Sequence, residues 1–442
     1  MDRLIVKGGN KIQGEIKVSG AKNVAMKVIL AGLLTDKPIY VENVPLISSI
    51  FGTAEIVKPL GVAVKLKENH TMTIIGDGLK NHIVPLQLGG LYRTATMVMG
   101  PLLSRLGKAT VPNPGGCRIG KRPIDRHIDG LKAMGAKIKY KNGFFVAETN
   151  RLHGAKYRFT TNTHTGTESL ILAAVLADGE TVLENAAEEP EVDDLIRLLN
   201  LMGAKIRRRK RVIAISGVKK LDGAEFSVMP DRNEAVTFAI AAIATKGDLI
   251  VDGTQREYLK SFLEKLDEAC GRWEPISGTK TRFFSSPQLK PTNVTTSPHP
   301  GFMTDWQAPW ALLMTQGGGI STIHETIYED RFGYVSELRK MGAKIDFFNP
   351  KVGSPQTTYN FNWKDKRNNL QAIKIYGPQN LHNAVIDVCD LRAGATLILS
   401  SLIASGESII SGIEHIDRGY EDIEMRLSSL GAKIKRIKGD LL

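Results

Sequence analysis

The segment from Val111 to His127 combines one thiol with several cationic side chains. It reads Val-Pro-Asn-Pro-Gly-Gly-Cys-Arg-Ile-Gly-Lys-Arg-Pro-Ile-Asp-Arg-His. Its prolines and glycines predict an irregular loop, and a helix should begin near Pro123 because proline is favoured in a first helical turn. Neighbouring cations lower the pKa of a thiol, so Cys117 is a candidate reactive cysteine. The alternative is a small cysteine that only fills space in the core.

The same cations, together with exposed backbone N–H groups, are suited to binding phosphate or carboxylate. Residues 115–121 fit the first part of the GxxxxGK nucleotide-binding pattern. However, Arg122 stands where that pattern needs Ser or Thr to bind Mg²⁺, and prolines precede the segment in place of a buried strand. We therefore do not expect an NTPase site.

Three cysteines, at positions 117, 270 and 389, are widely spaced and form no CxxC pair. This spacing argues against a disulfide framework and against a structural zinc site. We expect neither a metal nor a cofactor.

The chain has 442 residues, which is long for one core and favours two domains. Its formal charge of +13 predicts an anionic partner but does not choose among nucleic acid, acidic lipid and phosphorylated metabolites. The apolar run from Ala235 to Ala244 is shorter than the roughly 18 residues of a membrane span. The first residues lack the apolar core of a signal peptide, so we expect a cytoplasmic protein.

A short phrase recurs along the chain, as in Leu338-Arg-Lys-Met-Gly-Ala-Lys-Ile345 and Leu430-Gly-Ala-Lys-Ile434. It predicts the end of an amphipathic helix, a left-handed glycine and then an alternating strand. It alternates with a small-residue helix that is followed by glycine and a β-rich segment, as from Ser169 to Glu184. The repeats predict six α/β units, three per domain, with a boundary near Pro230. The six phrase glycines are Gly61, Gly135, Gly203, Gly271, Gly342 and Gly431.

The spacing between the last two units is lengthened by a polar and aromatic segment from Asn349 to Asn369. We interpret it as a surface insertion. The ordinary expectation for such a segment is a long loop or an added hairpin that has no part in the chemistry.

Seven phrases follow in order along nearly the whole chain: Ser19-Gly-Ala-Lys-Asn23, Pro114 to Pro123, Glu184 to Glu191, Pro230-Asp-Arg-Asn-Glu234, Pro298 to Asp305, Asp390-Leu-Arg-Ala393 and His415-Ile-Asp-Arg-Gly-Tyr-Glu421. Together they resemble the enolpyruvyl transferases. The start Gly-Ala-Lys-Asn and the cysteine loop are more similar to the branch whose acceptor is UDP-N-acetylglucosamine than to the branch that makes 5-enolpyruvylshikimate 3-phosphate.

The resemblance implies the two-domain enolpyruvyl transferase fold, with six α/β units arranged three per domain around a pseudo-threefold axis. One domain would hold residues 21–229, the other residues 1–20 and 230–442, with the active site in the cleft between them. The implied reaction transfers the enolpyruvyl group of phosphoenolpyruvate to the 3′-hydroxyl of UDP-N-acetylglucosamine through a tetrahedral intermediate, releasing phosphate, in peptidoglycan precursor synthesis.

These two substrates are the implied partners; nucleic acid and membrane are not expected, and a monomer is favoured. Two alternatives stay open. The acceptor could be another nucleotide or nucleotide-sugar, or the chain could be a non-catalytic repeat protein that binds anions.

The resemblance also implies roles for individual residues. Cys117 would be the general acid, with the capacity to form a covalent adduct with phosphoenolpyruvate, and Asp305 would be the base. Lys22, Asp390 and Arg392 complete the expected catalytic set. Phosphoenolpyruvate would be bound by Lys22, Asn23, Arg122, Arg331 and Arg418. The UDP-sugar would be bound by Asn23, Arg93, Arg122, Pro123, Ile124, Asp125, Arg126, His164, Thr165, Gly166, Asp305 and Ile327.

Several of these residues also have structural interpretations. Arg93 could cap or cover the helix that it opens, and Asp390 and Arg392 could form a structural ion pair. The basic run at 207–211 fits an exposed strand or hairpin turn, and the spacing of Trp306 and Trp310 is typical of packing along a helix.

The chain also departs from the family pattern. His164-Thr-Gly-Thr-Glu168 replaces Ser-Val-Gly-Ala-Thr, which touches the expected uridine site, and Arg118 and Lys121 stand where small residues are common.

Overall fold

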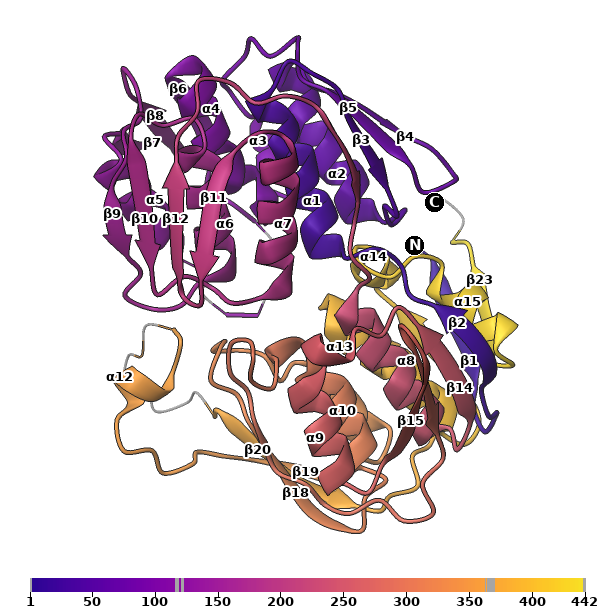
Figure 1. The fold of residues 1–442 in the computed structure, drawn as a ribbon. Helices are drawn as coiled ribbons and strands as arrows, with labels where there is room; N and C mark the ends of the chain where they lie inside the picture. The colour runs from indigo at the N-terminus through magenta and orange to yellow at the C-terminus, as the bar shows by residue number, and fades with distance from the viewer. Residues whose placement is uncertain (1, 116–118, 121–122, 362, 364–369, 440–442) are drawn as a thin grey trace. The chain divides into compact units, whose positions relative to one another are not determined.

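The computed structural model describes residues 2–115, 119–120, 123–361, 363 and 370–439. Contacts within the chain group it into two compact units (Figure 1). The C-terminal unit holds residues 1–19, 117–121 and 230–442, and the N-terminal unit holds residues 20–116 and 122–229.

The N-terminal unit contains strands and helices in alternation. Its strands are β3 (Ile39–Glu42), β4 (Ala63–Leu66), β5 (Met72–Ile75), β6 (Lys108–Pro112), β7 (Lys137–Lys141), β8 (Phe144–Glu148), β9 (Lys156–Arg158), β10 (Glu180–Glu184), β11 (Lys205–Arg209), β12 (Val212–Ser216) and β13 (Ala224–Ser227). Its helices are α1 (Lys22–Ala31), η1 (Gly32–Leu34), α2 (Ser48–Val57), η2 (Lys58–Leu60), α3 (Leu86–Gly89), η3 (Arg93–Val98), α4 (Met99–Leu106), α5 (Asp125–Ala133), α6 (His164–Ala174) and α7 (Pro190–Leu201).

The C-terminal unit has the same alternation and also includes the first two strands of the chain. Its strands are β1 (Arg3–Lys7), β2 (Gln13–Lys17), β14 (Asp248–Asp252), β15 (Arg272–Ser277), β16 (Lys280–Phe284), β17 (Val294–Thr295), β18 (Gly319–His324), β19 (Ile345–Phe348), β20 (Ala372–Gly377), β21 (Val385–Asp387), β22 (Glu407–Ser411) and β23 (Lys433–Ile437). Its helices are α8 (Arg232–Ala244), η4 (Arg256–Tyr258), α9 (Lys260–Glu268), η5 (Thr304–Trp306), α10 (Gln307–Met314), α11 (Tyr334–Lys340), α12 (Pro355–Thr358), α13 (Leu391–Ile403), α14 (Ile413–Ile416) and α15 (Ile423–Ser429).

Within the described residues, each unit contains three small sheets of one design. The orders are β13-β3-β5-β4, β6-β8-β7 and β11-β12-β10-β9 in the N-terminal unit, and β15-β16-β14-β2, β17-β18-β20-β19 and β21-β22-β1-β23 in the C-terminal unit. In five sheets a parallel edge strand pairs with an otherwise antiparallel set, as β9 does with β10. In the sixth, a parallel bridge from Ile83 to Thr110 takes that place. The six predicted α/β units are therefore present.

The small-residue helices form the centre of the C-terminal unit. Every residue of α8 and α10 is buried, because alanine and branched apolar residues occupy all sides of these helices. Helices α8, α10 and α13 pack against one another. Trp306 and Trp310 are fully buried, and their rings contact those of Phe262 and Phe302 edge to face. The predicted packing role of the two tryptophans is confirmed.

The repeated phrases end helices as expected, with one exception. Gly61, Gly135, Gly203, Gly342 and Gly431 all have positive φ. In the degenerate phrase, however, Cys270 adopts φ of 55° and Gly271 does not lie in the left-handed region. The prediction that Gly271 ends this helix is wrong, because the phrase is one residue out of step with the others.

Two edge strands are exchanged between the units at the points where the chain passes from one unit to the other. Strand β2 precedes α1 but pairs in parallel with β14, whereas β13 precedes α8 but pairs in parallel with β3. Strand β1 lies between β22 and β23 and is antiparallel to both. The N-terminal strands therefore complete two sheets made mainly of C-terminal residues.

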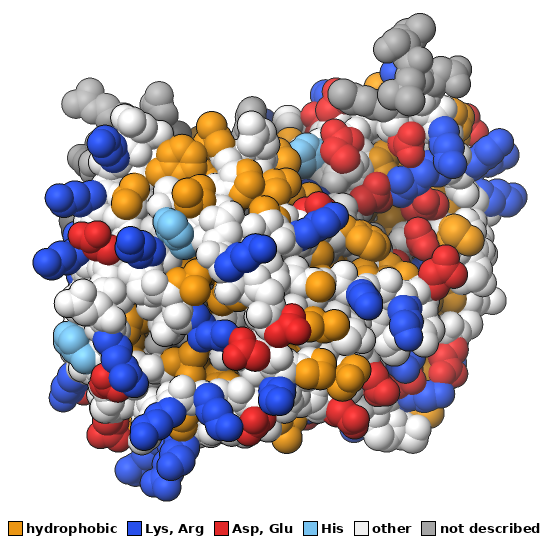
Figure 2. Space-filling model, turned by 90° about the horizontal axis from the view of Figure 1, so that it is seen from above, with side chains coloured by type: hydrophobic (Ala, Val, Ile, Leu, Met, Phe, Trp, Pro, Cys, Tyr) orange, Lys and Arg blue, Asp and Glu red, His pale blue; other side chains and the backbone are white. Residues whose placement is uncertain are grey.

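The basic run at 207–211 spans the end of β11 and the hairpin turn to β12, as predicted. Arg208 pairs with Asp193 at 2.8 Å and Arg211 pairs with Glu188 at 2.6 Å. Figure 2 shows one face of the molecule, on which Lys and Arg side chains are interspersed with Asp and Glu. In the described part of the chain, helices are too short or too polar to cross a membrane.

Candidate active site

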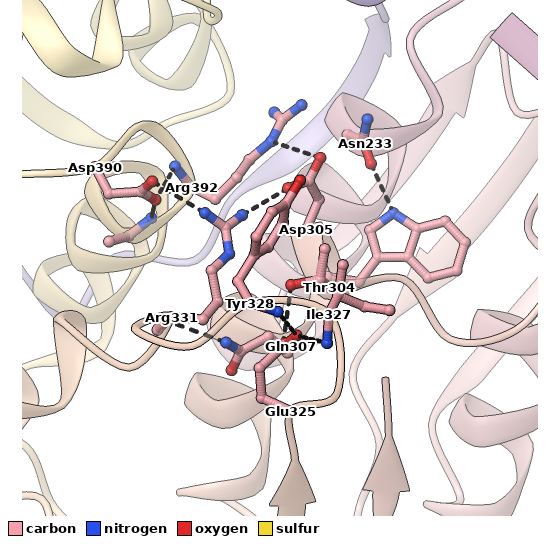
Figure 3. Close-up of polar contacts among 12 residues, drawn as sticks. Asn233, Thr304, Asp305, Gln307, Glu325, Ile327, Tyr328, Arg331, Asp390 and Arg392 are labelled. Carbon is pink, nitrogen blue, oxygen red and sulfur yellow. Dashed lines mark hydrogen bonds and ion pairs between the residues drawn. The ribbon is translucent and has the colours of Figure 1, made fainter. Parts of the chain in front are cut away.

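Four charged side chains of the C-terminal unit meet in one cluster (Figure 3). The Arg331 guanidinium lies between two carboxylates: its Nη2 is 2.6 Å from Oδ1 of Asp305 and its Nη1 is 3.0 Å from Oδ2 of Asp390. The Nε of Arg392 lies 3.8 Å from the other oxygen of Asp305. The structure thus brings together Asp305, Arg331, Asp390 and Arg392, all predicted site residues.

Local structure places each member of this cluster. Asp305 lies in the turn η5 before α10, and Arg331 lies in the loop that follows β18. Asp390 caps α13: its Oδ1 accepts hydrogen bonds from the backbone N–H groups of Arg392 at 2.9 Å and Ala393 at 3.0 Å. The structural alternative, an ion pair between Asp390 and Arg392, does not describe this arrangement: one oxygen of Asp390 accepts from the Arg392 backbone N–H and the other faces the Arg331 side chain.

The cluster is largely withdrawn from solvent, and its charges compensate one another. Burial alone would lower the pKa of Arg331, but Asp390 and Asp305 outweigh it and raise the pKa, so the guanidinium stays charged. The Asp305 side chain is 23% exposed, whereas that of Arg331 is 5% exposed. Asp305 is therefore the more accessible partner for a substrate.

Arg392 has an incomplete set of partners among the described residues. Its side chain is 6% exposed, and its buried Nη1 has no hydrogen-bond partner there. The guanidinium carbon lies 5.2 Å from the ring centroid of Tyr420, whose hydroxyl is 2.7 Å from Oγ1 of Thr237. A buried guanidinium with an unused donor is suited to receiving an anion.

Glu325 organises the loop that leads to Arg331. Its carboxylate is fully buried and accepts hydrogen bonds from the N–H groups of Ile327 at 2.7 Å and Tyr328 at 3.1 Å, and from the Thr304 hydroxyl at 2.9 Å. Burial raises the pKa of Glu325 in spite of these donors. Ile327 is predicted to contact the UDP-sugar. The Glu325 carboxylate thus fixes its position through its backbone N–H.

Arg418 is the remaining predicted site residue of the C-terminal unit that the structure describes. Arg418 is half-buried in the turn after α14. Cys117 and Arg122, together with Arg118 and Lys121, lie outside the described residues.

The other predicted residues belong to the N-terminal unit. Lys22 and Asn23 are the first residues of α1, and His164, Thr165 and Gly166 are the first residues of α6. Arg93 opens η3 and donates from Nη2 to the carbonyl oxygen of Pro123 at 3.2 Å. Ile124, Asp125 and Arg126 form the start of α5, where Asp125 accepts a hydrogen bond from the Arg126 N–H at 3.0 Å.

His164 belongs to a buried charged group that joins α1 and α6. The Nε2 of His164 is 3.2 Å from one oxygen of Glu168, and the Nζ of Lys27 is 3.1 Å from the other. Lys27 and Glu168 are almost completely buried. Burial lowers the pKa of His164, but Glu168 outweighs it, so the pKa is raised. The departure at 164–168 thus places an ion pair beneath the start of α6.

Several of these residues were not identified from sequence. Lys27 and Glu168 carried a usable signal, because each is a single charge in an otherwise apolar helical stretch and such charges are normally paired. Glu325 and Tyr420 carried no such signal, because their roles depend on contacts between distant parts of the chain.

Comparisons with known proteins place this chain in a family. A family model described as EPSP synthase (3-phosphoshikimate 1-carboxyvinyltransferase) matches residues 6–427. The chain belongs to this family of enolpyruvyl transferases and is an enzyme of the transferase class.

The curated relatives are similar over their whole length. A protein of Koribacter versatilis named UDP-N-acetylglucosamine 1-carboxyvinyltransferase is 42% identical over 99% of this chain and 97% of its own. A protein of Hydrogenovibrio crunogenus with the same name is 40% identical, over 99% of this chain and all of its own.

Solved structures support the fold. The crystal structure of the enolpyruvyl transferase NikO from Streptomyces tendae has a TM-score of 0.85 at 21% identity and covers 98% of both chains. A structure of EPSP synthase from Acinetobacter baumannii has a TM-score of 0.70 at 18% identity, covering 99% of this chain and all of that one. At such identities the likeness concerns the fold alone, and it confirms the predicted enolpyruvyl transferase fold.

Proposed function

We propose that this enzyme transfers the enolpyruvyl group of phosphoenolpyruvate to the 3′-hydroxyl of UDP-N-acetylglucosamine and releases phosphate. The observation that carries the proposal is the full-length similarity to proteins named for this acceptor. The charged cluster around Arg331 supports it, because an anionic substrate needs fixed cations where water is excluded.

Phosphoenolpyruvate would be held mainly by cations. Arg392 is buried and has a donor without a partner in the described part of the chain, which fits a carboxylate or phosphate ligand. In the proposed site Lys22, Asn23, Arg122, Arg331 and Arg418 bind the rest of the substrate, as the family resemblance implies.

The proposed reaction is an addition followed by an elimination. Cys117 supplies a proton to the methylene carbon while the 3′-oxygen bonds to the neighbouring carbon, and Asp305 receives the hydroxyl proton. The tetrahedral intermediate then loses phosphate from that carbon and a proton from the new methyl group, which restores the double bond. The methyl proton returns to the Cys117 thiolate, and the proton held by Asp305 leaves with the phosphate. Asp305 is suited to this part because two guanidinium groups orient it while part of its carboxylate stays exposed.

One observation favours a second acceptor. His164 and Glu168 introduce an ion pair at the start of α6, where the resemblance places the uridine diphosphate site. A different nucleotide or nucleotide-sugar is therefore the alternative acceptor.

Phosphate release with phosphoenolpyruvate and a panel of acceptors tests the proposal. We expect release with UDP-N-acetylglucosamine and little with the bare nucleotide or with shikimate 3-phosphate. Release only with another nucleotide-sugar would establish the alternative acceptor. If the folded protein released no phosphate with any acceptor of the panel, the enzymatic assignment to these substrates would be overturned.

Labelling with a fosfomycin-type epoxide tests the thiol separately. We expect Cys117→Ser to abolish labelling and to lower turnover, while Cys270→Ser and Cys389→Ser leave both nearly unchanged. For Cys389, which is exposed, the reason is that local desolvation and the neighbouring Asp390 raise its pKa, which disfavours the thiolate. Equal labelling of all three variants would remove Cys117 from the proposed mechanism.

The proposed product is a precursor of peptidoglycan. Both proposed substrates are charged metabolites, which fits the cytoplasmic location expected from the sequence. A monomer is also expected, and analytical ultracentrifugation would test it.

A further inference from the structure

The insertion predicted from sequence lies within a hairpin. Residues 349–371 join β19 to β20, antiparallel neighbours in which Phe348 lies opposite Ala372. Three other repeats make the equivalent connection with a tight turn, at residues 142–143, 210–211 and 278–279. Joining the two strands therefore does not require the extra residues.

The base of the insertion contacts the loop at 325–331. Gln371 is 1% exposed, and its carbonyl oxygen accepts a hydrogen bond from the Glu325 N–H at 2.8 Å. Its side-chain Nε2 donates to the carbonyl oxygen of Glu329 at 3.1 Å. Asn349 closes the base by accepting from the Gln371 N–H at 3.1 Å.

The middle of the insertion contacts the same loop from a second point. The Asn360 N–H donates to the carbonyl oxygen of Thr326 at 2.7 Å. The Tyr359 hydroxyl lies 3.2 Å from Nε2 of His324, and the two rings meet edge to face at 5.6 Å. Burial lowers the pKa of His324, which favours a neutral ring that can accept from the tyrosine.

Aromatic stacking stiffens this contact. The Tyr359 ring is nearly parallel to that of Trp363, with 4.5 Å between centroids, and it stacks on Phe361 at 5.2 Å. Tyr359 is 5% exposed, whereas Phe361 and Trp363 are only half-buried. Tyr359 is therefore the ring that connects the insertion to the body of the unit.

The contacted loop has two ends that are held differently. At one end, Ile327 depends on the Glu325 carboxylate and on the neighbouring Thr326, which the insertion binds. At the other end, Arg331 is held by Asp305, by Asp390 and through its carbonyl oxygen by Gln307 at 3.4 Å. Figure 3 shows Ile327 beside Glu325 and Arg331 beside Asp305 and Asp390. A change in the insertion should therefore move Ile327 more than Arg331.

We propose that residues 349–361, together with Gln371, form a clamp that positions Ile327 against the sugar part of the nucleotide-sugar acceptor, with Tyr359 and Asn360 as its positioning residues. This inference rests on the proposed function, in which Ile327 contacts the acceptor. It departs from the expectation that the insertion has no part in the chemistry. The clamp acts on the acceptor. It leaves unchanged the part of phosphoenolpyruvate binding that is assigned to Arg331, whose position depends on Asp305 and Asp390.

The test compares Tyr359→Ala with Tyr359→Phe in steady-state kinetics and in calorimetric titration with UDP-N-acetylglucosamine. In Tyr359→Ala we expect the acceptor KM and Kd to rise about tenfold, as the loss of a hydrogen bond and a ring contact would produce. The KM for phosphoenolpyruvate should stay within about twofold, which lies inside the scatter of neutral surface changes. Tyr359→Phe keeps the stack and should recover most of the acceptor affinity.

A second variant tests the clamp independently, in case the Tyr359→Ala protein does not fold. Replacing residues 350–370 by Asn-Gly would give the hairpin the tight turn of its counterparts. We expect the same selective loss of acceptor affinity, with cooperative unfolding preserved. Tyr140→Ala, which removes an exposed hairpin tyrosine of the N-terminal unit, is the matched control and should change neither KM.

Two results would overturn the clamp. One is an acceptor KM and Kd unchanged by both Tyr359→Ala and the shortened hairpin. The other is an equal rise in the KM values of both substrates. Wild-type phosphate release, measured in the same assay, reports on the proposed function separately, and the calorimetric titration reports on acceptor binding without turnover.

Discussion

Asp390 uses its two carboxylate oxygens for different purposes, one as the cap of α13 and one as a partner of Arg331. We expect Asp390→Asn to keep the cap, because an amide oxygen accepts the same hydrogen bonds, but to remove the charge facing Arg331. Its thermal stability should fall less than that of a variant that also loses the cap, while kcat/KM falls by about tenfold or more, as for a lost charged hydrogen bond.

Asp390→Ala removes both contributions. It should show the same loss of kcat/KM and, in addition, lose about 1 kcal/mol of stability with the cap. Thermal unfolding and phosphate-release kinetics measure the two effects separately. If Asp390→Asn turned over like the wild type, the charge beside Arg331 would have no catalytic value.

His164 should make stability depend on pH. Burial lowers its pKa and Glu168 more than restores it, so the folded value lies above the unfolded one. Protonated His164 then stabilises the fold below about pH 6.5, and this stabilisation is lost as the pH rises through the folded pKa. We expect the difference in unfolding free energy between wild type and His164→Gln to shrink as the pH rises above about 6.5 and through the folded pKa.

Urea unfolding at a series of pH values measures this difference. His382→Gln, which changes an exposed histidine, is the control for the substitution itself. Parallel profiles for the wild type and His164→Gln would contradict the assigned pairing with Glu168.

The family resemblance, and not residue types alone, predicted that Asp305, Arg331, Asp390 and Arg392 belong to a site. It did not predict which carboxylate faces which guanidinium, because that depends on where η5, the loop after β18 and the start of α13 converge.

At the scale of elements, α1 and α6 are joined by the buried pair of Lys27 and Glu168. Removing one partner leaves a buried charge without compensation, which costs about 3–5 kcal/mol. Glu168 has two cationic partners, so we expect Glu168→Leu to destabilise more than Lys27→Met.

The double variant Lys27→Met with Glu168→Leu should be less destabilised than the sum of the single variants, because neither charge is then left alone. A double-mutant cycle from urea unfolding measures this coupling. Additive effects would mean that the two side chains do not stabilise each other.

The ends of helices were predictable wherever a glycine follows the last turn, as at Gly342 and Gly431. The strand pairings were not. A three-residue strand such as β9 carries too few residues to show an alternating pattern, and its parallel partner is fixed only when the helix between them packs.

At the scale of the molecule, strands β1 and β2 complete two sheets of the C-terminal unit. Deleting residues 1–19 would leave β22, β23 and β14 with unpaired edges, which costs their hydrogen bonds and exposes core residues. We expect the truncated protein to lose the C-terminal unit preferentially.

Limited proteolysis followed by mass spectrometry tests this expectation. Cuts in the truncated protein should concentrate in residues 230–442, while residues 123–229 stay protected. Protection equal to that of the full chain would show that the two strands are dispensable.

The repeats were enough to predict six α/β units, because each carries the same helix ending. The family resemblance predicted that residues 1–20 join the second domain. The pairing partners of β2 and β13 were not predictable, because both strands precede helices as their counterparts do and nothing local indicates a distant partner.

Because their partner strands lie far along the chain, β1 and β2 must remain unpaired for part of the protein's synthesis. Strand β2 leaves the ribosome long before β14 exists, and at about 5–20 residues per second it waits roughly ten to fifty seconds for its partner. Strand β1 waits longer still, for β22 and β23. The sequence suits this delay: β2 reads Gln-Gly-Glu-Ile-Lys, and the apolar centre of β1 is bracketed by Arg3 and Lys7. Charges at these positions discourage a waiting strand from pairing with another nascent chain.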